Sequence, residues 1–275
     1  MTIVPAETAA RAPLRLTYVG HATVLIELDG VRLLTDPLLG RRLGPLRRHG
    51  ATPDPAELGR VDGVLISHGH PDHFHGASLS VVPGEPLLIM PRGLTPRGSP
   101  DDRAVRAVIS NDRVDVGSVR VTAVPARHGR WPGRRTARPV GYLIEGSTRV
   151  YFAGDTALYP GMAGLAGHVD VALLPVGRWG PPFGPARLDP STAVDAARLV
   201  GAAIAIPIHW GTLYVPGFAA GRWGWGSVDA GEAFAIEAAR RMPDLEVRVL
   251  RPGESTSVEL ARAPEERADL SSDDG

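Results

Sequence analysis

No cysteine occurs in the 275 residues of the chain. Disulfide bridges and thiolate metal sites are therefore excluded, and any metal ion must be bound by nitrogen and oxygen ligands. Long apolar runs are also missing, because no stretch approaches the roughly 20 residues that span a bilayer. The N-terminus has no apolar core behind a basic start, so no secretory signal is predicted. These absences favour a cytoplasmic protein without a transmembrane segment.

An excess of charge of either sign is absent too, since 30 basic residues balance 30 acidic ones. No overall field therefore favours nucleic acid or an anionic membrane, and we expect no nucleic-acid partner. Positive charge gathers only locally, in a loop at 41–49 that contains Arg41, Arg42, Arg47, Arg48 and His49. Such a loop is most often a solvated surface, and contact with an anionic substrate is the alternative.

Short β-rich runs dominate the chain, and hydrophobic residues at 43% are enough to bury a full core. The polar ends, 1–13 and 262–275, are predicted to be flexible around a single domain over 14–261. Strands are predicted over 14–19, 23–28, 31–35, 63–67, 86–90, 105–109, 119–124, 140–145, 149–153, 170–174, 204–208, 246–250 and 256–260.

Helical patterns are fewer than strand patterns. One helix is predicted from Pro190 to Gly201, and another follows Asp229 as its cap and stops before Pro243. Shorter helices are predicted near 76–82 and 160–166. Strands in hairpins early and late, with helices between them, predict two sheets packed face to face with helices outside.

The most informative segment is 67–75, which reads S-H-G-H-P-D-H-F-H directly after an apolar strand. Imidazole nitrogens and carboxylate oxygens are ligands for zinc, manganese and iron. His68 and His70 alternate and point the same way in an extended stretch, and Pro71 turns the chain so that Asp72 and His73 converge from a helix start. Two such pairs can bind two metal ions, which would clamp a bridging hydroxide as nucleophile.

Four ligands do not complete the coordination of two ions, and the chain supplies further donors at other strand ends. His128, Asp155 and His209 each follow an apolar strand. Each alone would more often be structural, but together they predict a shared pocket.

At these residues the chain resembles the metallo-β-lactamase fold superfamily, from about residue 14 to 212. The resemblance implies an αββα sandwich of two mixed β-sheets with helices outside. It also implies that one metal ion takes His68, His70 and His128, and the other takes Asp72, His73 and His209. Asp155 is the implied bridge. The expected cofactors are two divalent ions, zinc first, with manganese or iron as alternatives.

Finer motifs at 18–37, 170–177 and 208–212 are similar to one branch of that superfamily. The branch holds N-acyl-phosphatidylethanolamine phospholipase D and ascorbate-6-phosphate lactonase, and the match favours the phospholipase side. These motifs are specific for the branch and weak for the substrate.

Several residues around the ligands have two interpretations. Asp36 looks like the superfamily's carboxylate that orients metal-binding imidazoles, or it simply starts a turn with Pro37. His21 is expected to form a hydrogen bond at the pocket and not to bind metal, or to cap a strand. His75 is not expected to be a ligand. Substrate contacts are expected from residues near the metals, namely Arg178, Trp179 and Trp210.

These observations predict a dinuclear metal-dependent hydrolase with Asp72, Asp155 and His209 as catalytic residues. The expected substrate is a small anionic or ester-containing molecule, with a phosphodiester first and a lactone or other ester second. Iron-based redox chemistry is an alternative on the same fold, and a metal-binding module without hydrolytic activity is another. A homo-oligomer is left open.

Overall fold

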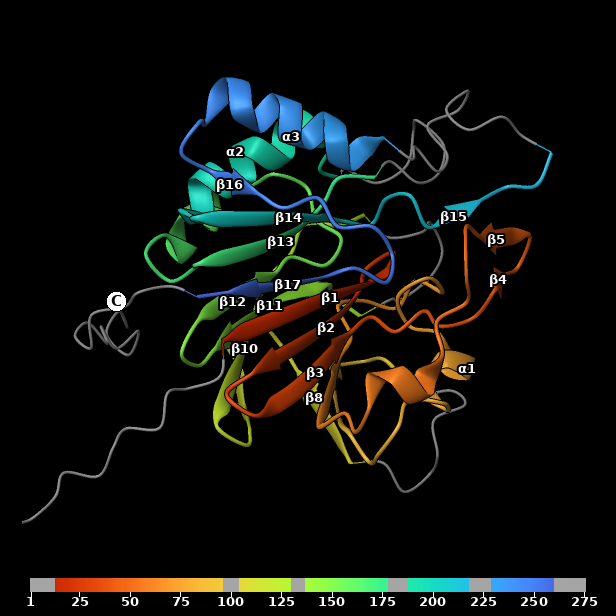
Figure 1. Cartoon of the computed structure of the whole chain (residues 1–275). Coiled ribbons are helices and arrows are strands. Elements are labelled where there is room, and N and C mark those ends of the chain that lie inside the picture. The colour runs from red at the N-terminus through yellow and green to blue at the C-terminus, as the bar shows by residue number, and fades with distance from the viewer. Residues whose placement is uncertain (1–12, 96–103, 130–136, 178–186, 218–228, 260–275) are drawn as a thin grey trace, which may run out of the picture.

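Two mixed β-sheets packed face to face form the centre of the molecule (Figure 1). The structure is a computed structural model, and it describes residues 13–95, 104–129, 137–177, 187–217 and 229–259. The predicted termini and parts of several loops lie outside these described residues.

The first sheet combines an antiparallel N-terminal meander with parallel strands. Its order is β17 (Ser255–Val258), β1 (Leu14–Gly20), β2 (Thr23–Leu28), β3 (Val31–Thr35), β6 (Gly63–Leu65), β7 (Leu87–Pro91) and β8 (Val105–Val108). The predicted hairpin turn between β2 and β3 is formed by Asp29 and Gly30, whose φ angles are 50° and 81°. Two successive positive φ values match the right-handed twist of the flanking strands.

The second sheet mirrors this arrangement, with antiparallel strands followed by parallel ones. Its order is β16 (Glu246–Val247), β14 (Ile204–Ile208), β13 (Val171–Pro175), β12 (Arg149–Phe152), β11 (Val140–Glu145), β10 (Val119–Pro125) and β9 (Arg113–Val116). The strand predicted over 246–250 is therefore only two residues long.

Helices cover both outer faces, which confirms the predicted αββα layers. On the second sheet lie α2 (Pro190–Val200) and α3 (Ala230–Arg241), and on the side of the first sheet lie α1 (Gly76–Leu79) and the 3₁₀ turn η1 (Pro55–Leu58) (Figure 1). The helix predicted near 160–166 is the 3₁₀ turn η2 (Pro160–Leu165). Among the described residues, no helix has the length and hydropathy needed to cross a membrane.

The predicted caps of the two long helices differ in outcome. Asp189 caps α2, because its side chain accepts from the Thr192 amide while the Thr192 hydroxyl accepts from the Asp189 amide. Gly201 ends the helix with φ 67°. Asp229 is the N-cap residue of α3, as predicted, but its side chain makes no capping hydrogen bond.

Three buried apolar layers hold the sandwich together. The largest lies between the sheets and includes Leu16, Ile26, Tyr142, Phe152 and Leu173, all fully buried. A second layer joins the second sheet to α2 and α3, and a third joins the first sheet to α1 and η1. Burial of this apolar area is the main stabilising term of the fold.

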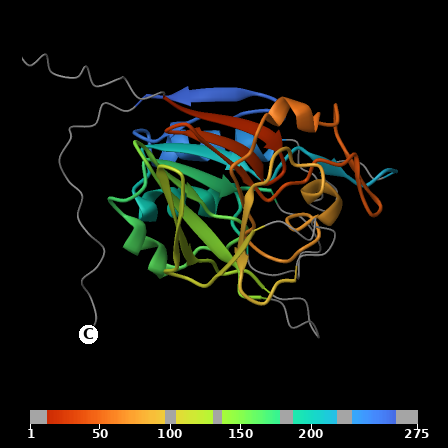
Figure 2. The same cartoon turned by 90° about the horizontal axis from the view of Figure 1, so that it is seen from below.

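A small third sheet occupies the predicted basic loop, which is a correction. β4 (Arg42–Leu43) and β5 (Leu46–Arg48) form a hairpin that pairs with β15 (Leu213–Tyr214). Both views show it projecting from one side of the sandwich (Figures 1 and 2). Arg48 is buried and donates to the carbonyls of Val19 and Leu38, so this arginine anchors the hairpin.

Candidate metal centre

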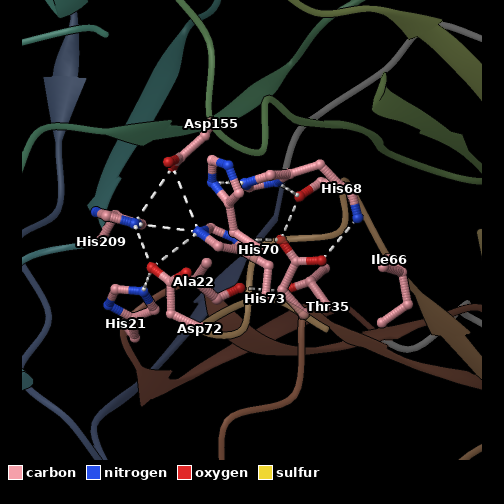
Figure 3. A network of polar contacts seen from close by, with 12 residues as sticks. His21, Ala22, Thr35, Ile66, His68, His70, Asp72, His73, Asp155 and His209 are labelled. Carbon is pink, nitrogen blue, oxygen red and sulfur yellow. Dashed lines mark hydrogen bonds and ion pairs between the residues drawn. The ribbon is translucent and has the colours of Figure 1, made fainter. Parts of the chain in front are cut away.

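The predicted metal ligands converge from the carboxyl ends of strands in both sheets. His68, His70, Asp72 and His73 follow β6 of the first sheet; His128, Asp155 and His209 follow β10, β12 and β14 of the second. At this edge the Val140 amide donates to the Ser67 carbonyl at 3.0 Å, which joins the two sheets directly. Figure 3 shows His68, His70, Asp72, His73, Asp155 and His209 pointing toward a common centre.

A first group of donors consists of three imidazoles and one carboxylate. His68 Nε2 lies 2.8 Å from His70 Nδ1, and His128 Nε2 lies 3.3 Å from the same atom. The fourth member is Asp155, whose Oδ2 lies 3.6 Å from His128 Nε2. One ligand atom of each residue falls within 4.8 Å of the others. This spacing fits four ligands around one ion.

A second group lies beside the first. His73 Nε2 and His209 Nε2 are 3.2 Å apart, and Asp72 Oδ2 lies 3.5 and 3.7 Å from them. The other oxygen of Asp155, Oδ1, lies 3.3 Å from His209 Nε2 and 3.7 Å from His73 Nε2. Asp155 therefore presents one oxygen to each group, the arrangement expected of a bridging ligand.

The charge states of these residues suit divalent cations. Burial lowers the pKa of His68, and of His128 to about 4, so both imidazoles are neutral and keep a lone pair. Although burial opposes ionisation, the surrounding imidazoles hold the pKa of Asp72 and Asp155 well below the usual range. Neutral imidazoles and ionised carboxylates are the forms that bind metal ions.

His73 differs from the other imidazoles. Burial alone would lower its pKa, but the carboxylates of Asp72, Asp155 and Asp36 raise it well above the ordinary value. Without cations, His73 is therefore protonated, and its positive charge partly balances the negative charge of the three carboxylates. The donor set thus fits two divalent ions, which would replace that proton.

Asp36 and Ser67 orient an imidazole in each group. The His73 Nδ1–H donates to Asp36 Oδ2 at 2.7 Å, and the Ser67 hydroxyl donates to the same oxygen at 2.5 Å. His68 Nδ1 lies 3.0 Å from the Ser67 hydroxyl and donates to it. Both imidazoles therefore direct Nε2 into the centre. Asp36 lies where its predicted role requires, whereas the role of Ser67 was not predicted, although it directly precedes His68.

His21 joins the strand-end loops of the two sheets. Its Nε2 lies 3.0 Å from Asp72 Oδ2, where it can donate a hydrogen bond to that carboxylate. The His209 amide donates to the His21 carbonyl at 2.6 Å. Burial, with the charge of His209, lowers the pKa of His21 to about 3. This placement agrees with the expected hydrogen bond at the pocket.

Two glycines are required by close contacts behind the ligands. A Cβ at Gly177 would lie 1.9 Å from the His209 carbonyl oxygen, and one at Gly154 would lie 2.5 Å from the Ser67 Cβ. Only a residue without a side chain permits these approaches.

His75 and Trp210 lie outside the two donor groups. His75 belongs to neither group, and its Nδ1 lies 2.8 Å from the Ser78 hydroxyl. Trp210, for which a substrate contact was expected, has its indole buried against Gly231 of α3, where it donates to the Pro207 carbonyl. Arg178 and Trp179 lie outside the described residues.

Comparisons with known proteins show which family and fold the chain resembles. A family model described as "Beta-lactamase superfamily domain" matches residues 31–210. A UPF0173 metal-dependent hydrolase of Aeropyrum pernix is 30% identical over 270 residues, covering 90% of this chain and 99% of that protein. An uncharacterized protein of Mycobacterium bovis is 34% identical over 221 residues, 72% of this chain, and the match spans only 59% of its length.

The fold also matches a solved structure. Igni18, a metallo hydrolase from Ignicoccus hospitalis, superimposes with a TM-score of 0.66 at 22% identity, covering 90% of this chain and 99% of that one. At this identity the likeness concerns the fold alone.

Proposed function

Because the chain belongs to the metallo-β-lactamase superfamily and, within it, to the UPF0173 metal-dependent hydrolases, we propose that it is a hydrolase with two divalent metal ions. The observation that carries the proposal is the division of Asp155 between two donor groups. His68, His70 and His128 would hold one ion, and Asp72, His73 and His209 the other. Zinc is the ion we propose first, with manganese or iron as alternatives.

When bound, the two ions would supply a water nucleophile at neutral pH and stabilise the charge that develops on the bond under attack. The protein's own part is orientation and proton transfer. Asp36 and Ser67 fix two imidazoles, and His21 holds the carboxylate of Asp72. The Asp72 side chain is 24% exposed, against 5% for Asp155, so we propose Asp72 as the carboxylate nearer to the entering substrate.

For the substrate we propose a phosphodiester first and a lactone or other ester second. The motifs at 18–37, 170–177 and 208–212 support this order, because they resemble the branch of N-acyl-phosphatidylethanolamine phospholipase D and ascorbate-6-phosphate lactonase. No serine or cysteine nucleophile is needed in this scheme. We propose a small-molecule substrate and no nucleic-acid partner.

The test is a screen of zinc- and manganese-loaded protein against bis-p-nitrophenyl phosphate, lactones and thioesters. We expect turnover of at least one class. His68→Ala should abolish that turnover and lower the metal content measured by mass spectrometry. His75→Ala is the matched control, because this imidazole lies seven positions later and outside both groups. If the wild type turns over no compound in the screen while His68→Ala still lowers the metal content, the result would instead favour a metal-binding module.

A further inference from the structure

Arg187 precedes α2, and the residue after it is bonded to the loop that carries Asp155. Its neighbour Leu188 is buried in the apolar layer under α2, and the Leu188 amide donates to the Thr156 carbonyl at 2.8 Å. The capping bonds between Asp189 and Thr192 begin the helix immediately afterwards. The backbone of Arg187 is therefore followed directly by an anchored core residue and a helix cap.

Thr156 connects this segment to two of the ligands. It directly follows Asp155, and its hydroxyl accepts from the amide of Arg127, which directly precedes His128, at 2.9 Å. The loops that carry Arg187, Asp155 and His128 are thus joined by hydrogen bonds through one threonine. This places Arg187 on the side of the first donor group.

The guanidinium of Arg187 has no anionic partner among the residues that the structure describes. Its Nε is buried and makes no hydrogen bond there. The ion pairs between described arginines and carboxylates all involve other arginines. Burial is the main cause that lowers the pKa of His70 and of His128, and the positive charge of Arg187 adds to both shifts. A partly buried guanidinium without a partner is costly, and an oxyanion would relieve that cost.

The neighbouring arginine is already engaged. Arg127 is exposed, and its guanidinium carbon lies 5.8 Å from the centre of the Tyr159 ring in a cation–π contact. Of the two cations joined through Thr156, Arg187 is the one left to bind a ligand.

We propose that Arg187 binds a negatively charged oxygen of the substrate at the metal centre, so that the substrate is an oxyanion such as a phosphate ester. The inference rests on the proposed function and deepens it, because it names the charge of the substrate and the residue that recognises it. A planar guanidinium forms two parallel hydrogen bonds to phosphate, which a lysine cannot reproduce.

The test measures binding of inorganic phosphate to the zinc-loaded protein by titration calorimetry, without turnover. We expect Arg187→Gln to raise the Kd by about tenfold or more, since a hydrogen bond to a charged group is lost. Arg187→Lys should lie between wild type and Arg187→Gln. Arg127→Gln is the matched control and should change the Kd by about twofold or less. Metal content and melting temperature should match the wild type in all three variants.

An Arg187→Gln variant with wild-type phosphate affinity would overturn the assignment. So would an equal loss in Arg127→Gln, which would indicate a general field effect, or a wild-type protein that binds no phosphate. The two proposals fail separately. Phosphate binding through Arg187 without hydrolysis of any compound in the screen would refute only the hydrolase. If the protein hydrolyses a compound in the screen but Arg187→Gln binds phosphate with the wild-type Kd, only the anion site would be refuted.

Discussion

Replacing Asp36 by asparagine should weaken the binding of both metal ions, because this fully buried carboxylate orients one imidazole in each donor group. His73 donates to Asp36 Oδ2 directly, and His68 does so through the Ser67 hydroxyl. Each imidazole carries its hydrogen on Nδ1 for this purpose. Both Nε2 atoms are thereby left free to bind metal.

An amide cannot satisfy the same donors. If its nitrogen takes the place of Oδ1, it meets the Ser67 amide, which donates there at 2.7 Å; a buried donor left without an acceptor costs about 1–3 kcal/mol. If it takes the place of Oδ2, it faces the His73 Nδ1–H. The imidazole must then move its hydrogen to Nε2, the atom that faces the ion. We expect a loss in metal affinity of about 10–100-fold, or about 1.4–2.7 kcal/mol.

The assay is competition for zinc with a chromogenic chelator, together with urea unfolding of each variant. Asp62→Asn is the matched control, because Asp62 accepts from the Arg32 amide at 2.9 Å at the opposite end of the β3–β6 pair. It should keep wild-type zinc affinity. A folded Asp36→Asn protein that binds both ions as tightly as the wild type would refute this reasoning.

Three further changes test other parts of the site. Asp155→Asn should lower the metal content from two ions per chain to one or fewer, measured by mass spectrometry, because one oxygen of the bridge becomes a donor. Gly177→Ala should lower the free energy of unfolding by about 1–3 kcal/mol in urea, since its Cβ would lie 1.9 Å from the His209 carbonyl oxygen. Gly164→Ala is the control, because its Cβ would meet nothing within 4 Å and the free energy of unfolding should change little. Metal-free protein should lose stability as the pH falls from 6.5 to 5. The reason is that the buried His21, with its pKa lowered to about 3, stays neutral in the folded protein while the same residue takes up a proton in the unfolded chain. One such group contributes at most about 1.4 kcal/mol per pH unit, and His21→Gln should reduce the slope of unfolding free energy against pH. A slope that His21→Gln leaves unchanged would contradict this assignment.

The long strands could be predicted from the sequence because their signal is local. β2, β3, β11 and β14 have the predicted bounds, since each is a run of apolar or β-branched residues between turn residues. The Asp29–Gly30 turn was predictable for the same reason. The hairpin β4–β5 was not, because its strands have only two and three residues and depend on Arg48 binding carbonyls far along the chain.

The convergence of the site residues was also predictable in part, because His128, Asp155 and His209 each follow a strand of the second sheet that ends at the same edge. Their directions were not. His209 has φ 64°, and this left-handed turn sends Trp210 back toward α3 although its neighbour points to the metals. Arg187 belongs to no periodic pattern, and only the hydrogen bonds through Thr156 place it beside His128.

The same backbone geometry helps to position the donor groups and the residues that orient them. Among the residues of the site, His21, Asp36 and His209 have positive φ, a conformation that costs a non-glycine residue roughly 1 kcal/mol or more. Each is held by specific bonds: the His209 amide to the His21 carbonyl, the His21 amide to the Thr212 hydroxyl, and the Asp36 amide to the Leu65 carbonyl. The strain is offset by the packing of the surrounding sheets. The positive φ values turn the chain at the strand ends, so that these side chains point inward; a residue in the extended conformation would continue the direction of the strand. Preorganised donors lose less entropy on binding, so we expect these strained strand ends to favour the binding of metal ions.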